Sequence, residues 1–154
     1  MDLHPDFKDL LAEFARSEVS YAVLGGYAVS YHAKPRATQD LDLLLSSQDD
    51  NLQRAADALA AFGASAPLVA RVRRLKPTEI AYVGAPPVRV DLLCAADGIE
   101  TESAILRAEL AFVNGLSIPI VALDDLIANK RAAARPQDLA DVALLERAQA
   151  VGEP

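Results

Sequence analysis

Three aspartates lie in apolar segments where an acidic residue is unusual. Asp40 and Asp42 alternate with leucines at the start of the segment 40–45. If this segment is a strand, the two carboxylates share one face and lie about 6 to 7 Å apart at the backbone. Asp91 interrupts a second apolar segment, 88–93. A pair of neighbouring strands would bring all three together and form a site for a hard divalent cation such as Mg²⁺.

Gly25 and Gly26 end a short apolar segment, Tyr21–Leu24, and precede a short helical segment at 27–32. Glycines at a strand-to-helix turn let backbone N–H groups approach a phosphate closely, and the helix directs its positive end to the same place. Together with three strand-borne carboxylates, this turn predicts a two-metal phosphoryl-transfer site that takes a nucleoside triphosphate. Taken separately, the glycines indicate only a turn, and Asp91 alone indicates an edge-strand acid that faces water.

Length and composition limit the class of protein. The chain has 154 residues and is 52% hydrophobic, which fits one domain over 1–154 with a sizeable core. We find no apolar run near the ~20 residues that span a bilayer, and no secretion signal at the start. The single cysteine, Cys94, excludes an internal disulfide. These features predict a cytoplasmic protein that is not embedded in a membrane.

The charge argues against broad, nonspecific binding of nucleic acid. The net charge is −7, whereas such binding needs a basic surface. One local group of cations, Arg71, Arg73, Arg74 and Lys76, is either a solvated stretch or a contact for RNA.

The remaining pattern positions these residues within an alternation of helices and strands. Strands are predicted at 21–24, 40–45, 78–83, 88–93, 111–113 and 117–121, and the last two surround an Asn-Gly turn. Helices are predicted at 5–17, 27–32, from 47 to about 62, 101–107, from 124 or 125 to about 134, and from 136 to about 148, whereas 66–74 fits no single class. The order predicts an α/β (α+β) fold: a small mixed sheet flanked by helices, with a core at about 20–121 and a C-terminal helical pair at about 123–149.

Two segments carry a resemblance to a known family. Residues 23–28, Val-Leu-Gly-Gly-Tyr-Ala, and residues 36–43, Arg-Ala-Thr-Gln-Asp-Leu-Asp-Leu, resemble the AbiEii-type branch of the DNA polymerase β-like nucleotidyltransferases. That branch contains the toxins of type IV toxin–antitoxin systems of bacteria. A C-terminal run with Lys130 followed by Arg-x-x-Asp at 135–138 is also similar to it.

The resemblance implies transfer of a nucleoside monophosphate from an NTP to a hydroxyl. It implies that Asp40, Asp42 and Asp91 are catalytic metal ligands, that two Mg²⁺ ions are the cofactors, and that a cognate antitoxin or other partner protein exists. By the resemblance, Gly25, Gly26 and Lys130 bind the nucleotide. Arg36 and Thr38 lie in the loop before the Asp-x-Asp strand, and this position predicts that they contact the nucleotide or the acceptor. The residues themselves leave alternatives: Arg36 and Thr38 stabilise a loop, and Lys130 forms a structural pair with Asp138.

Two departures from the family pattern keep a second function open. Many active transferases have Gly-Ser where this chain has Gly-Gly, and the chain is shorter than the typical toxin of the branch. The alternative is therefore a catalytically weak or inactive module that binds a nucleotide or a partner. The acceptor is equally open: an RNA, a protein or a small molecule, as in antibiotic-modifying transferases.

Overall fold

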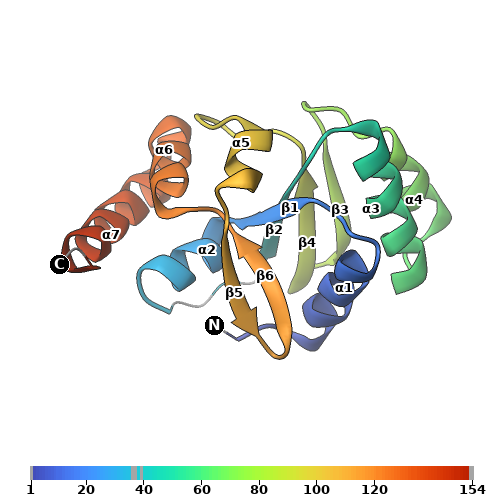
Figure 1. Ribbon diagram of the computed structural model, residues 1–154. Coiled ribbons are helices and arrows are strands. Elements are labelled where there is room, and N and C mark those ends of the chain that lie inside the picture. The colour runs from blue at the N-terminus through green and yellow to red at the C-terminus, as the bar shows by residue number, and fades with distance from the viewer. Residues whose placement is uncertain (1, 36–37, 39, 153–154) are drawn as a thin grey trace.

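The computed structural model describes residues 2–35, 38 and 40–152, and its elements alternate as predicted (Figure 1). The strands are β1 Tyr21–Leu24, β2 Asp40–Leu45, β3 Ile80–Ala85, β4 Val88–Leu93, β5 Glu109–Val113 and β6 Leu116–Ile120. The helices are α1 Pro5–Arg16, α2 Gly25–His32, α3 Asp49–Phe62, α4 Ala66–Arg73, α5 Thr101–Leu106, α6 Leu123–Ala133 and α7 Pro136–Gly152.

The six strands form one mixed sheet in the order β3-β4-β2-β1-β6-β5. Strand β2 pairs with β4 in parallel and with β1 in antiparallel orientation, and β1 pairs with β6 in parallel. The antiparallel hairpins β3–β4 and β5–β6 form the two edges of the sheet. This arrangement confirms the predicted α/β fold with a mixed sheet flanked by helices.

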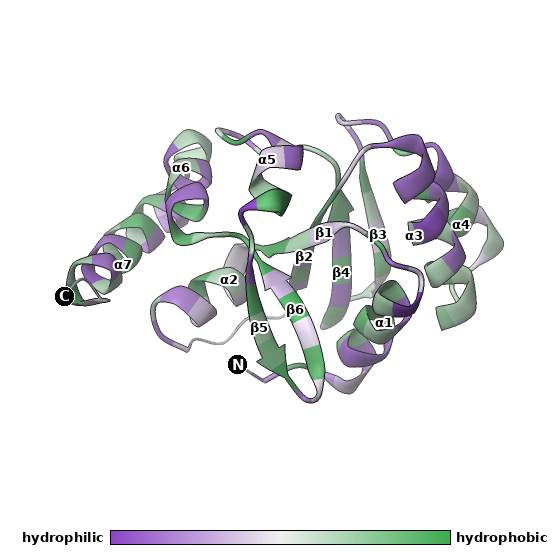
Figure 2. Ribbon diagram, in the orientation of Figure 1, coloured by the Kyte–Doolittle hydropathy of each residue, from purple (hydrophilic) through white to green (hydrophobic). Residues whose placement is uncertain are grey.

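One face of the sheet is buried beneath three helices. Helices α1, α3 and α4 gather on this side (Figure 1), and the apolar face of α1 presents Phe7, Leu10, Leu11 and Phe14. Leu41 and Leu43, which alternate with the two acids of β2, are fully buried. Val90 and Leu92, which alternate with the charged residues of β4, are buried as well. Because side chains alternate along a strand, Asp40, Asp42 and Asp91 project to the opposite, more open face. Strand β4 accordingly shows hydrophilic purple beside hydrophobic green (Figure 2).

Several boundaries differ from those predicted. Helix α2 begins at Gly25 and so includes both glycines, and the ambiguous segment 66–74 forms α4, which Ser65 caps by accepting a hydrogen bond from the Leu68 N–H. Strand β3 begins two residues later than predicted, at Ile80, and β5 begins two residues earlier, at Glu109. Leu110 and Phe112 on β5 are exposed, and these apolar residues pointing to solvent blurred the alternation that marks a strand.

Helices α6 and α7 pack against each other and against α2, beside the open face of the sheet (Figure 1). None of the helices in the described part of the chain has the length and apolar character that a membrane crossing needs.

Candidate functional site

The three aspartates come together on neighbouring strands. Asp42 of β2 and Asp91 of β4 are register partners in a parallel pair, and Asp40 lies two residues before Asp42 on the same face. The same register places Asp40 beside Arg89. Alternation predicted the shared face, but only the pairing of β2 with β4 brings Asp91 level with Asp42.

Gly25 lies directly beneath the carboxylate of Asp42. Its φ is +64°, in the left-handed region that favours glycine, and a Cβ added there would be 2.0 Å from Oδ2 of Asp42. Leu24, the last residue of β1, is the register partner of Asp42, which explains why the strand-to-helix turn meets this side chain. The glycine is therefore required by both its backbone conformation and the space that Asp42 occupies.

Arg89 is a member of the site that the sequence analysis missed. Its Nε donates to Oδ1 of Asp91 at 2.8 Å, and its Nη2 lies 3.2 Å from Oδ2 of both Asp40 and Asp91. Its guanidinium carbon also lies 4.7 Å from the centre of the Tyr82 ring. Arg89 precedes Asp91 by two residues on a strand, so the alternation that grouped Asp40 with Asp42 would have found it.

The ionised form of Asp42 is disfavoured by its surroundings. Its pKa is raised to about 7, most strongly by burial and further by the charge of Asp91, a hydrogen bond with Asp91 and the charge of Asp40. Lys130 opposes this rise in pKa. Near neutral pH, the carboxyl group of Asp42 therefore keeps a proton in part of the molecules, and a bound cation would displace that proton.

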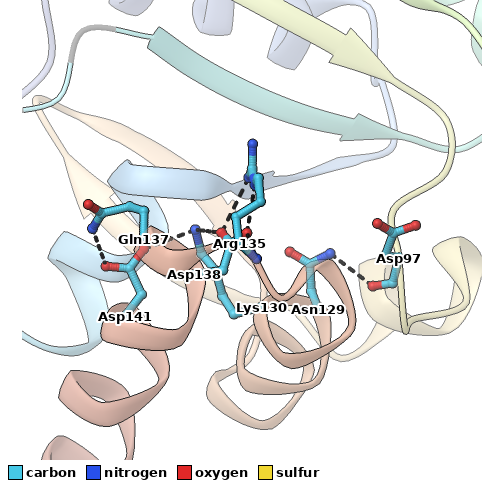
Figure 3. A network of polar contacts seen from close by, with 7 residues as sticks. All are labelled: Asp97, Asn129, Lys130, Arg135, Gln137, Asp138 and Asp141. Carbon is cyan, nitrogen blue, oxygen red and sulfur yellow. Dashed lines mark hydrogen bonds and ion pairs between the residues drawn. The ribbon is translucent and has the colours of Figure 1, made fainter.

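A second set of charged residues lies on α6, on α7 and in the turn between them (Figure 3). Nζ of Lys130 lies 3.2 Å from Oδ1 of Asp138 and 3.1 Å from Oδ2 of Asp141. Only 8% of the Lys130 side chain is exposed, and the two aspartates are buried. The structural pairing weighed for Lys130 is thus present, and the same lysine also lines the cleft and acts on Asp42.

Arg135 adds a further cation, which the sequence analysis quoted only as part of a motif. Its Nε donates to Oδ2 of Asp138 at 2.7 Å, and its charge interacts with that of Asp42. Nδ2 of Asn129 donates to the backbone carbonyl of Asp97 at 2.9 Å, which ties α6 to the segment after β4 (Figure 3).

These groups line one cleft of about 900 Å³ between the sheet and the C-terminal helices. Gly25, Gly26, all three aspartates and Lys130 belong to its wall. Thr38 is half-buried and is not part of the wall, and Arg36 lies outside the described residues. Other lining residues include Pro77, Ile80, Arg89, Asp97, Asn129, Arg135, Gln137 and Asp138.

The donor set fits a hard divalent cation. Carboxylate oxygens are the ligands that such ions prefer, and Asp42 already shares a hydrogen bond with Asp91. Arg89 shows that a positive group fits between Asp40 and Asp91. Within residues 2–35, 38 and 40–152, no three acidic, histidine or cysteine side chains are spaced as a complete metal site. Because Arg89 binds both Asp40 and Asp91, a cation that used either carboxylate would have to displace its guanidinium.

Solved structures with a similar fold are nucleotidyltransferases and proteins like them. ANT(2″)-Ia in complex with adenylyl-2″-tobramycin has a TM-score of 0.57 and 13% identity, over 94% of this chain and 91% of that one. The lincomycin-bound lincosamide antibiotic adenylyltransferase LnuA has the same TM-score and identity, over 94% and 96%. An antigenic nucleotidyltransferase-like protein from Paracoccidioides brasiliensis has a TM-score of 0.56 and 11% identity, over 97% and 77%. At these identities the likeness establishes the fold alone.

No curated protein matches the sequence. The family model described as "Nucleotidyl transferase AbiEii toxin, Type IV TA system" matches residues 9–154, nearly the whole chain. This match covers the glycine turn, the three strand-borne aspartates and the Lys130 and Arg135 region. The chain therefore belongs to the AbiEii nucleotidyl transferase toxin family of type IV toxin–antitoxin systems.

Proposed function

We propose that the protein is a Mg²⁺-dependent nucleotidyltransferase that moves a nucleoside monophosphate from an NTP to an acceptor hydroxyl. The observation that carries this proposal is the pairing of opposite charges across one cleft. Asp40, Asp42 and Asp91 lie on the sheet, whereas Lys130 lies on α6 and Arg135 lies in the turn between α6 and α7. A metal-bound triphosphate needs both groups, because carboxylates hold the metal and cations hold the phosphates.

Each group has a role in this reaction. Asp42 would hold the metal, joined by Asp40 and Asp91 once the Arg89 guanidinium has moved away from both carboxylates. Up to two Mg²⁺ ions held there would stabilise charge on the triphosphate and lower the pKa of the acceptor hydroxyl. Lys130 and Arg135 bind the phosphates that leave, and the backbone N–H groups at Gly25 and Gly26 bind the others. The acceptor oxygen bonds to the α-phosphorus, the bond to the β-phosphate oxygen breaks, and pyrophosphate departs. Asp91 takes the proton of the acceptor.

A second candidate is a module that binds nucleotide or a partner with little or no turnover. The specific observation in its favour is Arg89, which holds Asp40 and Asp91 at 2.8 to 3.2 Å and so competes with a metal for both carboxylates. This candidate predicts binding of Mg-NTP without release of pyrophosphate.

In either case, membership of the toxin family supports a role in a bacterial toxin–antitoxin pair, with a cognate antitoxin as partner and the cytoplasm as its location.

The decisive experiment incubates the protein with each α-³²P-labelled NTP, Mg²⁺ and cell extract. We expect label from one or more of the nucleotides in an RNA, protein or small-molecule fraction, and none with the double variant Asp40→Asn/Asp42→Asn. The matched control is Asp9→Asn/Asp49→Asn, which removes the same charge from exposed positions outside the cleft. Transfer that persists in the cleft variant would disprove the site. Binding of Mg-NTP without any transfer supports the second candidate.

A further inference from the structure

A second hollow lies outside the proposed nucleotide cleft, where α4 leads into β3. Its volume is about 570 Å³. Three of its four charged residues are cations, although the chain as a whole has a net charge of −7. The lining residues are Pro67, Ala70, Arg71, Arg74, Lys76 and Glu79.

The cations of this segment differ in how they are held. Arg71 donates from Nη2 to the backbone carbonyl of Ile80 at 3.0 Å and lies 3.9 Å from Glu79. Arg73 turns away, because its guanidinium bonds to Asp57 at 2.8 Å. The exposed side chains of Arg74 and Lys76, by contrast, make no hydrogen bond or ion pair with any residue that the structure describes. Two cations of the hollow are therefore available to a ligand.

The hollow adjoins the nucleotide cleft at the start of β3. The lining residues alternate along the chain: Lys76 and Glu79 line the hollow, whereas Pro77 and Ile80 line the cleft. From this junction, β3 runs along the edge of the sheet towards the three aspartates. A ligand chain that begins in the hollow can therefore continue into the cleft.

The part of β3 between the hollow and the aspartates exposes apolar and aromatic side chains. Ile80 is 39% and Tyr82 is 51% exposed. Tyr82 is the register partner of Asp91, and both project to the open face. The Arg89 guanidinium lies over one face of the Tyr82 ring, 4.7 Å from its centre. An exposed ring in this position offers a stacking surface one strand away from Asp91.

Unpaired cations at the start of an edge strand and an exposed aromatic ring further along the same strand suit single-stranded nucleic acid, since cations contact phosphates and a ring stacks on a base. We propose that the acceptor is a single-stranded polynucleotide. Its phosphates contact Arg74 and Lys76, and a base stacks on Tyr82, which brings a hydroxyl of the strand to Asp91. This inference rests on the proposed transferase function and names its acceptor class.

The test measures binding of a fluorescein-labelled single-stranded 12-mer, as RNA and as DNA, by fluorescence anisotropy over a series of salt concentrations in EDTA. Each phosphate contact contributes about 0.7 to the slope of log K against log salt. We expect the variant Arg74→Gln/Lys76→Gln to lower this slope by about 1.4 and to bind more weakly at every salt concentration. The RNA and DNA probes decide whether the strand is recognised through its phosphates and bases or also through its 2′-hydroxyls.

The matched control is Lys8→Gln/Arg147→Gln, which removes the same charge from exposed positions outside both hollows. It should keep the wild-type slope. Equal losses in the two double variants, no binding by the wild-type protein, or equal displacement of the probe by polyglutamate would each overturn the inference. A separate Mg-NTP titration distinguishes the two proposals. A protein that binds the strand but does not bind Mg-NTP would contradict the proposed transferase function alone. A protein that binds Mg-NTP but not the strand would contradict the proposed acceptor class alone.

Discussion

At the scale of single residues, the cleft brings three carboxylates of neighbouring strands close together. Burial and the neighbouring carboxylates raise the pKa of Asp42 to about 7, and the chain counters the excess charge with Arg89 on Asp40 and Asp91. Asp42 itself receives only the more distant influence of Lys130 and Arg135. The carboxylate with the least compensation is therefore the one where a bound cation should have the largest effect on the protein.

The raised pKa of Asp42 predicts how the stability of the metal-free protein depends on pH. An unfolded aspartate titrates near pH 3.9, so between pH 4 and 7 the folded protein keeps a proton that the unfolded chain has released. Stability from this group is thus fully present below pH 4 and is lost as pH rises towards 7. Urea unfolding in EDTA should show that the wild type loses about 2 kcal/mol more than Asp42→Asn between pH 5.5 and pH 8. Parallel pH profiles would contradict this reading.

Arg89 should compete with a divalent ion, because its guanidinium occupies two of the three candidate ligands. Replacing it by an uncharged residue frees those carboxylates. We expect Arg89→Gln to bind Mn²⁺ about tenfold more tightly than the wild type, a change of about 1.4 kcal/mol. The signal of free Mn²⁺ in electron paramagnetic resonance measures this affinity.

Two controls accompany that titration. Arg89→Lys keeps the positive charge and should remain near wild type, and Arg54→Gln removes a cation from the exposed surface of α3. Unchanged affinity in Arg89→Gln would mean that the guanidinium does not compete with the metal.

At the scale of elements, two neighbouring cations of α6, Lys130 and Arg131, form ion pairs of unequal burial with α7. Lys130 is buried with Asp138 and Asp141, whereas Arg131 on the same helix pairs with Glu146 at the surface. Removing one partner of a buried pair leaves an uncompensated charge, but an exposed pair contributes little. The cation proposed to contact phosphate is therefore also a structural residue.

This contrast can be measured with two variants of one helix. Lys130→Met should lower the free energy of unfolding by about 3 kcal/mol, because Asp141 and part of Asp138 lose their cation. Arg131→Met should lower it by less than about 1 kcal/mol. Urea titration monitored by circular dichroism gives both values, and similar costs for the two variants would show that Lys130 is not a buried structural cation.

The elements also show how far the sequence could predict the site. Alternation along a strand was sufficient to place Asp40 with Asp42, and it would have been sufficient for Arg89 with Asp91. The level pairing of Asp42 with Asp91 was beyond prediction, because the register of a parallel pair depends on residues far apart in the chain. The start of α2 was also missed, since a glycine with positive φ does not signal a first helical residue. That Lys130 would be buried between two aspartates depends on how α6 meets α7.

At the scale of the whole molecule, the cleft joins three distant stretches of chain, near residues 24–42, 77–97 and 129–138. A ligand that contacts all three must hold them together, so its binding energy adds to the stability of each. The nucleotide should therefore protect the sheet and the C-terminal helices at the same time.

Hydrogen exchange can test this coupling. Saturating Mg-NTP should slow amide exchange in both β4 and α6, and it should leave unchanged those amides of α3, outside the cleft, that exchange by local opening. At a ligand concentration 100 times Kd, the stabilisation should approach about 2.7 kcal/mol. The variant Asp40→Asn/Asp42→Asn should show neither effect. Protection confined to one stretch would mean that the ligand does not bridge the cleft.

Gly25 carries no reactive group, yet the carboxylate of Asp42 occupies the space that any other side chain would need. In a saturation library selected for function, position 25 should return glycine as strictly as position 42 returns aspartate. The sequence requirements of the site thus include residues whose side chains act in it and a glycine that only leaves room for one of them. A search for related sites that considers reactive side chains alone would therefore overlook Gly25.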